Sequence, residues 1–499
     1  MRDLHIYRRL LGYVRPYRTK LFVSLVLTTV VAGAMPAIAL LVKNVMDDIF
    51  IARNMSMLQL ITAAVVAIYL IKSLCDYFSY YFMNDVGQSV IRDIRDRLYG
   101  HIQTLSMPYF IRTPTGVLIS RITNDVNLVQ LSVTESVTEF IRQSITLVGL
   151  VGAVFYRDWR LAIVAMLVFP IVVYPINRFG QRLKRYSTKG MRVMGNVMSI
   201  LDEAISGIRI VKAFTMEDYE YRRFSNENHD FYRNWMKRIR VRALSGPMME
   251  LIGGLGTAVL LLYGGIRVIN GAMTPGDFMS FITGLSLLYA PIRKLNKVNI
   301  EIQEGIAAAR RIFELLDTKP EIQDAPGAVE LRDIDGGFEF NGVWFSYTQD
   351  ETYAIRDINI RALPGQTIAI VGESGSGKST IANLLPRFFD VSKGSIRVSG
   401  TDIRNVTMRS LRQNIALVTQ EPVLFNDTIR ANIAYGTGNS TFEDVVAAAT
   451  AANAHDFITE LPKGYDTVIG ESGVRLSGGQ RQRICIARAI IKNAPILIL

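Results

Sequence analysis

Long apolar stretches separated by polar and basic segments dominate the first three-fifths of this sequence. Because an α-helix rises 1.5 Å per residue, about 20 apolar residues are enough to cross the hydrocarbon core of a membrane. Six stretches of roughly this length predict membrane spans: residues 21–43, 57–83, 139–156, 161–176, 247–269 and 278–292. The shorter stretches would also fit buried helices of a soluble protein. Six of them with few internal charges favour a polytopic α-helical membrane domain over residues 1–316.

The pattern changes after residue 316. Residues 317–337 contain two prolines and several acidic residues, and they predict a linker. From residue 338 to residue 499, short β-branched runs such as residues 367–371 alternate with helical stretches. This alternation predicts a soluble α/β domain, in which residues 367–371 form a buried strand.

Composition and charge narrow the class of protein. The sequence is 49% hydrophobic and 20% charged, with a net charge of +12, which argues against a disordered chain and a purely nucleic-acid-binding one. Basic residues concentrate at the N-terminus and in the long connections 84–138 and 177–245, so the positive-inside rule predicts that these segments and both termini are cytoplasmic. Cys75 and Cys485 lie far apart in the sequence, which excludes a disulfide framework.

A cleaved signal peptide is the alternative for the first span. Several arginines precede that span, and residues 32–34 give the small-x-small pattern of a cleavage site. The apolar run continues to residue 42, longer than a typical signal, and further spans follow. These features favour a retained span.

The second half of the chain contains a candidate phosphate-binding motif, Gly372-Glu373-Ser374-Gly375-Ser376-Gly377-Lys378-Ser379-Thr380. This motif follows the predicted strand and precedes a helical stretch over residues 381–385. The pattern G-x-x-x-x-G-K-[ST] in this context predicts a P-loop, whose backbone N–H groups converge on the phosphates of ATP. Lys378 would supply positive charge to those phosphates, and the Ser379 hydroxyl would bind Mg²⁺. A glycine-rich turn that merely precedes a lysine is the alternative.

Residues 476–483, Leu-Ser-Gly-Gly-Gln-Arg-Gln-Arg, stand directly before a helical stretch and resemble the signature sequence of ATP-binding-cassette (ABC) proteins. Ser477 can cap that helix while glycine N–H groups face a phosphate. The resemblance implies that Gln420 reaches Mg²⁺ and that Tyr347 stacks on adenine, although Tyr347 would also fit a strand core. The resemblance also implies catalytic roles for Lys378, Gln420 and Ser477. It implies that Ser379 and Gln420 bind Mg²⁺. The implied nucleotide contacts are residues 372–380 together with Tyr347, Gln420, Ser477, Gly478, Gly479 and Gln480.

The first half of the chain is similar to the membrane part of bacterial ABC exporters. Residues 114–126 resemble their first cytoplasmic loop, with a short coupling helix near 112–117, and residues 203–214 resemble the second. Six spans followed by one nucleotide-binding domain over residues 338–499 match a half-transporter, and within that class the lipid A (lipopolysaccharide core) flippases are the most similar.

This resemblance implies ATP-driven export or flipping of an amphipathic lipid, lipid A, across the bacterial inner membrane by alternating access. The implied cofactors are ATP and Mg²⁺, and the implied partners are a second copy of the chain and a membrane lipid, with no nucleic acid. A multidrug exporter is the main alternative. An ATP-gated channel and a siderophore importer of the same fold are the others.

Three basic residues within or at the edge of the spans, Lys72, Arg142 and Arg293, are the candidate substrate ligands. A charge at membrane depth costs about 2.5–3.5 kcal/mol on insertion scales, so each should face the protein interior or a wet cavity. Together they could form a ring of basic side chains that binds the phosphates of an anionic lipid. Alternatively, Lys72 pairs with Asp76, and Arg142 and Arg293 extend to the interface.

The sequence ends at residue 499, inside an apolar strand that is followed by Asp-Glu in ABC proteins. The base glutamate of the family lies beyond that position. We therefore expect the sequence to be a truncated form of a complete ATPase.

Overall fold

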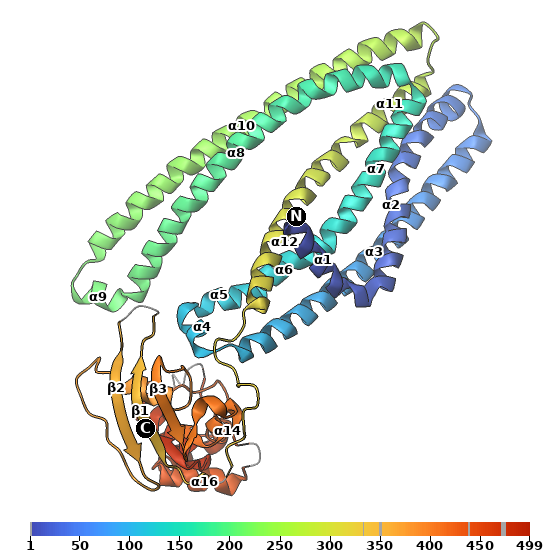
Figure 1. Cartoon of the computed structure of the whole chain (residues 1–499). Coiled ribbons are helices and arrows are strands. Elements are labelled where there is room, and N and C mark those ends of the chain that lie inside the picture. Colours follow the sequence, from blue (N-terminus) through green and yellow to red (C-terminus); the bar gives the residue numbers. More distant parts are fainter. Residues whose placement is uncertain (1, 333, 349–351, 438–439, 471–475) are drawn as a thin grey trace. The chain divides into compact units, whose positions relative to one another are not determined.

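The computed structural model describes residues 2–332, 334–348, 352–437, 440–470 and 476–499. The chain divides into two compact units, one formed by Met1–Asp96 and Thr123–Ile312 and the other by Arg97–Ile122 and Phe313–Leu499. The first unit is helical, whereas the second contains the strands (Figure 1).

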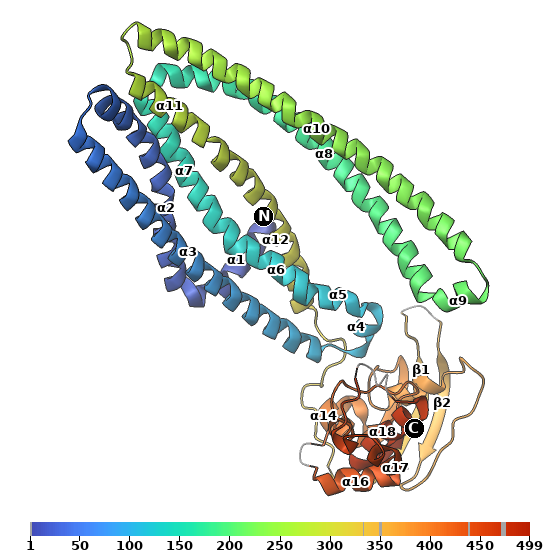
Figure 2. The same cartoon turned by 180° about the vertical axis from the view of Figure 1, so that it is seen from behind.

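Most helices of the first unit are long, as the apolar pattern predicts, and α3 and α12 continue into the second unit. The helices are α1 (Arg2–Val14), α2 (Arg18–Asn44), α3 (Met55–Thr104), α6 (Val126–Val133), α7 (Glu135–Arg157), α8 (Trp159–Ser206), α9 (Ile208–Ala213), α10 (Glu217–Ile269), α11 (Pro275–Leu287) and α12 (Tyr289–Asp317), with a 3-10 turn at Arg15–Tyr17 and π-helical stretches at Val45–Ile51 (η2) and Arg121–Asp125. Figure 2 shows α8 and α10 side by side over most of their length.

Within the described residues, four helical segments are long and apolar enough to cross a membrane: Arg8–Ile51, Met55–Thr104, Thr115–Arg157 and Glu217–Ile269. They contain four of the six predicted spans. The predicted span 161–176 lies in α8, and 278–292 covers most of α11 and the start of α12, with a break at Leu288. These two segments are helical, and their crossing of the membrane stays a prediction.

Polar residues pack between the helices of this unit while large apolar side chains face outward. The buried Ser24 and Thr28 of α2 share hydrogen bonds with Ser79 of α3, at 3.1 and 2.7 Å between the hydroxyl oxygens. The Thr146 hydroxyl of α7 donates to the Ala32 carbonyl of α2 at 3.2 Å. Exposed apolar residues such as Leu70 and Val148 lie on the same helices. Small polar residues at helix contacts and an apolar exterior are typical of membrane helix bundles.

Short connections between the long helices, near residues 47, 158 and 274, meet at one end of the bundle. Asp47 of η2 accepts hydrogen bonds from the Thr274 hydroxyl at 2.6 Å and from the Gly276 N–H at 2.9 Å. Asp158, which caps α8, forms an ion pair with Arg267 at the end of α10. These contacts join η2 to the start of α11 and the start of α8 to the end of α10.

The second unit contains α4 (Met107–Arg112), α5 (Thr115–Ser120), β1 (Phe338–Phe345), β2 (Ile355–Ala362), α13 (Lys378–Leu384), β3 (Lys393–Val398), β4 (Thr401–Asp402), α14 (Met408–Gln413), β5 (Ile415–Leu417), α15 (Ile429–Ile433), α16 (Phe442–Ala451), α17 (His455–Thr459), α18 (Gly478–Ile491) and β6 (Ile496–Ile498), with single turns at Ile403–Asn405 and Gly464–Asp466. The antiparallel sheet has the order β2-β1-β3-β4, and β5 pairs with β6 in parallel.

Two hydrophobic cores hold this unit together. Phe340, Val343 and Ile396 of the antiparallel sheet pack with Ile381 and Leu384 of α13. A second core gathers residues of α15, α16, α17 and α18, including Ile433, Val445, Ile458 and Ile484. The first core fixes the helix that follows the P-loop pattern, and the second fixes the helix that follows the signature-like sequence.

Two local predictions are wrong. Residues 367–371 do not form a buried strand: Val371 is 88% exposed, and no strand pairs with this stretch in the part of the chain that the structure describes. A strand needs a partner for its N–H and C=O groups, which an apolar pattern alone cannot supply. The helix near 112–117 is interrupted, because Thr113, which precedes Pro114, adopts an extended conformation with φ −116° and ψ 114°.

Candidate nucleotide-binding site

The predicted P-loop adopts a left-handed backbone conformation, which favours glycine, at two positions. Gly375 and Gly377 have φ angles of +85° and +90°. A Cβ added at Gly377 would lie 2.5 Å from Cγ2 of Ile355 in β2. Both the backbone conformation and the space beside β2 therefore require glycine at residue 377.

Lys378 is the first residue of α13, and its ammonium group lies within the loop. Its Nζ donates to the carbonyl oxygens of Gly372 at 2.9 Å and Glu373 at 2.7 Å, and lies 3.4 Å from the Ser376 hydroxyl. The positive charge is therefore held by the segment where phosphates are expected to bind. The adjacent Ser379 is exposed at the start of the helix.

Gly377→Ala is expected to weaken nucleotide binding and to lower the unfolding free energy by about 2–5 kcal/mol. A left-handed conformation costs a non-glycine residue about 1–2 kcal/mol, and overpacking against Ile355 adds about 1–3 kcal/mol. Thermal unfolding with and without ATP measures both effects. Gly365→Ala is the matched control, because its φ is +72° and an added Cβ would meet no atom within 4 Å. Equal effects of the two substitutions would contradict the steric argument.

Tyr347 lies beside α13, at the end of β1. Its hydroxyl shares a hydrogen bond of 3.0 Å with the Thr380 hydroxyl, and its ring meets Phe345 and Phe389 edge-on. The residue is 44% exposed, so it is not a buried core aromatic. The structure therefore brings together two of the predicted nucleotide contacts, Tyr347 and Thr380.

Gln420 is exposed, three residues after β5. The pairing continues past β5, because the Val418 N–H donates to the Ile498 carbonyl at 2.9 Å. Gln420 therefore follows the carboxyl end of a parallel strand, where ligands of α/β sheets usually bind.

The signature-like sequence begins α18 with a reciprocal cap. The Ser477 hydroxyl accepts from the Gln480 N–H at 3.2 Å, and the Gln480 side chain accepts from the Ser477 N–H at 2.8 Å. The predicted capping role of Ser477 is confirmed. A Cβ added at Gly478 or Gly479 would meet no atom within 4 Å, so packing within this chain does not require glycine there.

The three candidate substrate ligands lie on three different helices. Arg142 of α7 forms ion pairs with Asp76 of α3 at 3.0 Å and with Glu139 at 3.2 Å. Lys72 of α3 has its ammonium 6.0 Å from the centre of the Tyr69 ring, and Arg293 of α12 is exposed.

Two residues linked to Arg142 through ion pairs, Glu139 and Lys294, were not among the predicted site residues. Glu139, one helical turn before Arg142, also pairs with Lys294 of α12 at 3.0 Å. The i,i+3 spacing of Glu139 and Arg142 was the available signal, because it puts both side chains on one face of a helix.

Comparisons with known proteins cover both units. Residues 21–292 match the family model described as the ABC transporter transmembrane region, and residues 355–499 match the one described as ABC transporter. The chain is 48% identical over 496 residues to the ATP-dependent lipid A-core flippase of Syntrophus aciditrophicus. This alignment covers 99% of this chain and 82% of that flippase. The flippase of the same name from Desulfotalea psychrophila is 44% identical, over 100% of this chain and 87% of that protein.

Proposed function

Because this chain belongs to the ABC transporter family, we propose that it uses ATP to flip lipid A across the bacterial inner membrane, working as a homodimer. The observation that carries the proposal is the near full-length similarity to relatives named ATP-dependent lipid A-core flippases, at 48% and 44% identity. The family relationship makes the chain a multi-pass membrane protein with an ATP-binding domain. The basic N-terminal and connecting segments support a cytoplasmic position for that domain.

The nucleotide would bind over the P-loop. Lys378 and the N–H groups of residues 372–380 would hold the phosphates, and Tyr347 would offer its exposed ring to adenine. Ser379 and Gln420 suit Mg²⁺, because both carry exposed oxygen atoms, one at the start of α13 and one beyond the carboxyl end of β5. Mg²⁺ at these residues would neutralise phosphate charge.

The open glycines of the signature-like sequence support a site shared by two copies. A helix N-terminus with exposed N–H groups and unfilled space suits an approaching phosphate. Since a Cβ at Gly478 or Gly479 would meet no atom of the described residues within 4 Å, we propose that the nucleotide of a second copy occupies this space. Ser477 would position these groups through its cap.

The positive charges of Lys72, Arg142 and Arg293 support an anionic substrate. Arg142 forms ion pairs with carboxylates of two helices, so its guanidinium is already oriented toward anionic groups. Phosphates of an amphipathic lipid would replace these carboxylates, with the acyl chains along the apolar helices. A cation-exporting multidrug pump would be expected to present acidic or aromatic residues instead.

The test compares stimulation of ATPase activity by lipid A and by a hydrophobic cation in the full-length protein reconstituted in nanodiscs. Replacing Lys72, Arg142 and Arg293 together by alanine is expected to reduce lipid A stimulation about 10-fold or more, because hydrogen bonds to charged groups contribute about 1.5–3 kcal/mol each. Replacement of three exposed basic residues of α10, Arg222, Lys237 and Arg240, by alanine is the charge-matched control. Unchanged lipid A stimulation in the first variant would contradict the anionic-lipid site and favour a multidrug exporter.

A further inference from the structure

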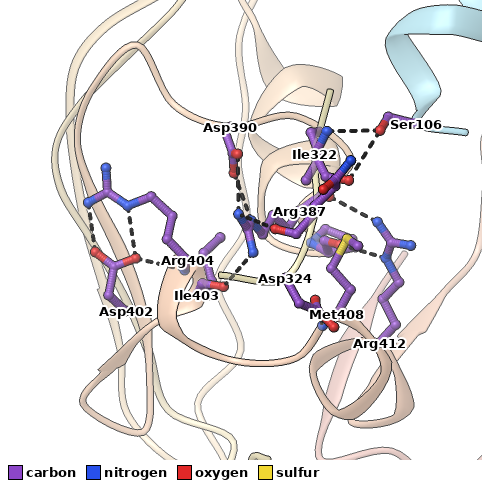
Figure 3. A network of polar contacts seen from close by, with 12 residues as sticks. Ser106, Ile322, Asp324, Arg387, Asp390, Asp402, Ile403, Arg404, Met408 and Arg412 are labelled. Atoms are coloured by element: carbon purple, nitrogen blue, oxygen red, sulfur yellow. Dashed lines mark hydrogen bonds and ion pairs between the residues drawn. The ribbon is translucent and has the colours of Figure 1, made fainter. Parts of the chain in front are cut away.

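A buried guanidinium joins the end of the P-loop helix to the linker. The Arg387 side chain is 5% exposed and forms an ion pair with Asp390 at 2.7 Å. It also donates to the carbonyl oxygens of Gln323 in the linker at 3.3 Å and of Ile403 at 3.4 Å. Figure 3 shows this side chain between the linker and the chain beyond β4. A buried charge bonded on three sides fixes the relative positions of the segments that it contacts.

The backbone of Arg387 is unusual as well. Its φ of +51° is a left-handed conformation, and its N–H donates to the Leu384 carbonyl at 3.0 Å to close the end of α13. Glycine or asparagine usually occupies such a position after a helix. The left-handed conformation carries a steric cost for an arginine, which the bonds of its side chain can offset.

A second arginine holds the same turn from the other side. Arg412 of α14 donates to the carbonyl oxygens of Pro386 at 3.1 Å and Arg387 at 3.0 Å. Burial and the neighbouring Arg387 charge lower the pKa of Arg412. Lys492, just after α18, donates to the Arg412 carbonyl at 2.7 Å. The turn after α13 is thereby connected to the helix that carries the signature-like sequence.

The linker is held on its other side by the segment Arg97–Ile122. The Ser106 hydroxyl, just before α4, accepts from the Ile322 N–H at 2.9 Å and donates to the Ile322 carbonyl at 3.3 Å (Figure 3). The Asp324 carboxylate accepts from the Met408 N–H at 2.8 Å. Linker residues 322–324 are therefore bonded to Ser106, Arg387 and α14 at once.

We propose that Arg387 is a positioning residue that transmits nucleotide binding from the P-loop to linker residues 322–324 and, through Ser106, to the segment Arg97–Ile122. Only α13 separates the P-loop from Arg387, so a shift of this helix when phosphate binds carries Arg387 with it. The planar guanidinium donates to the Gln323 and Ile403 carbonyls from two of its nitrogens, so both carbonyls would move with it. A lysine ammonium cannot form these two hydrogen bonds in the same geometry. The inference rests on the proposed binding of ATP at the P-loop.

The test is hydrogen–deuterium exchange of the full-length protein with and without ATP and Mg²⁺, in the wild type and in Arg387→Lys. In the wild type, nucleotide is expected to slow exchange in the P-loop, in residues 318–326 and in residues 97–122. In Arg387→Lys the P-loop should still respond, whereas the linker response should fall about 10-fold, the effect of losing hydrogen bonds to a charged group. Arg404→Lys is the matched control, because Arg404 forms a similar ion pair with Asp402 at 2.7 Å.

Each outcome decides the question. A linker response that persists in Arg387→Lys, or that is absent in the wild type while the P-loop responds, overturns the inference. A wild-type P-loop that does not respond overturns the proposed nucleotide site itself. If Arg387→Lys does not fold, Ser106→Ala replaces it, because this variant leaves Arg387 intact. The linker should then respond while residues 97–122 do not, and a response in both contradicts the transmission through Ser106.

Discussion

Replacement of Lys378 by alanine in the full-length protein is expected to weaken ATP binding by about 10- to 100-fold and to remove nucleotide-dependent transport. The ammonium lies within the P-loop and bonds to its carbonyl oxygens, so a phosphate that enters this loop meets a positive charge already in position. Hydrogen bonds to charged groups contribute about 1.5–3 kcal/mol each, and loss of a group that stabilises developing charge costs about 10²–10³ in rate. ATP affinity and ATPase turnover measure the two effects.

Two further variants separate the charge of Lys378 from other effects. Lys378→Met keeps the length of the side chain without its charge, and it should behave like the alanine variant. Lys463→Ala removes the same charge from an exposed site of the same unit and should leave both measurements unchanged. Membrane insertion should be normal in all three variants, since the P-loop lies outside the helical unit. Unchanged affinity and turnover in Lys378→Ala would show that the loop is not the nucleotide site.

The features that the sequence predicts correctly depend on neighbouring residues. The cap of α18 joins Ser477 and Gln480, three residues apart, and the glycines that follow Ser374 shape the loop before α13. The long helices likewise follow from their own apolar pattern. Within such short distances, residue type and spacing determine the structure directly.

The features that the sequence did not predict depend on distant partners. The strand predicted over residues 367–371 is not formed, because a strand needs a hydrogen-bonded partner that a local apolar pattern cannot predict. Arg387 forms a hydrogen bond with Gln323, 64 positions away in the sequence, and Ser106 forms one with Ile322, 216 positions away. Glu139 and Lys294 are likewise brought together only by the packing of α7 and α12. Such contacts follow from the fold, so sequence reasoning finds the nucleotide loop but not the buried arginine behind it.

A mixture of two inactive variants, Lys378→Ala and Gly479→Asp, is expected to recover ATPase activity if the working unit is a homodimer with shared sites. An aspartate at Gly479 would repel an approaching phosphate, while at a helix N-terminus it stabilises the helix by about 0.3–1 kcal/mol. An added Cβ at this position meets no atom of the described residues within 4 Å, so the fold should tolerate a side chain there. Each variant alone should be inactive, and co-expression from two differently tagged copies gives the mixed dimer for measurement.

The arrangement of the site decides the outcome. If each nucleotide lies between the P-loop of one copy and the signature-like sequence of the other, the mixed dimer has one site with both parts intact. The other site then carries both changes. If each copy completes its own site, every site in the mixture carries one defect and no activity returns. Mixing either variant with a copy that carries both substitutions is the control, because every shared site then contains at least one defect. Activity in the mixed dimer but not in the control therefore requires a nucleotide shared by two copies, and its absence would contradict the homodimer proposal.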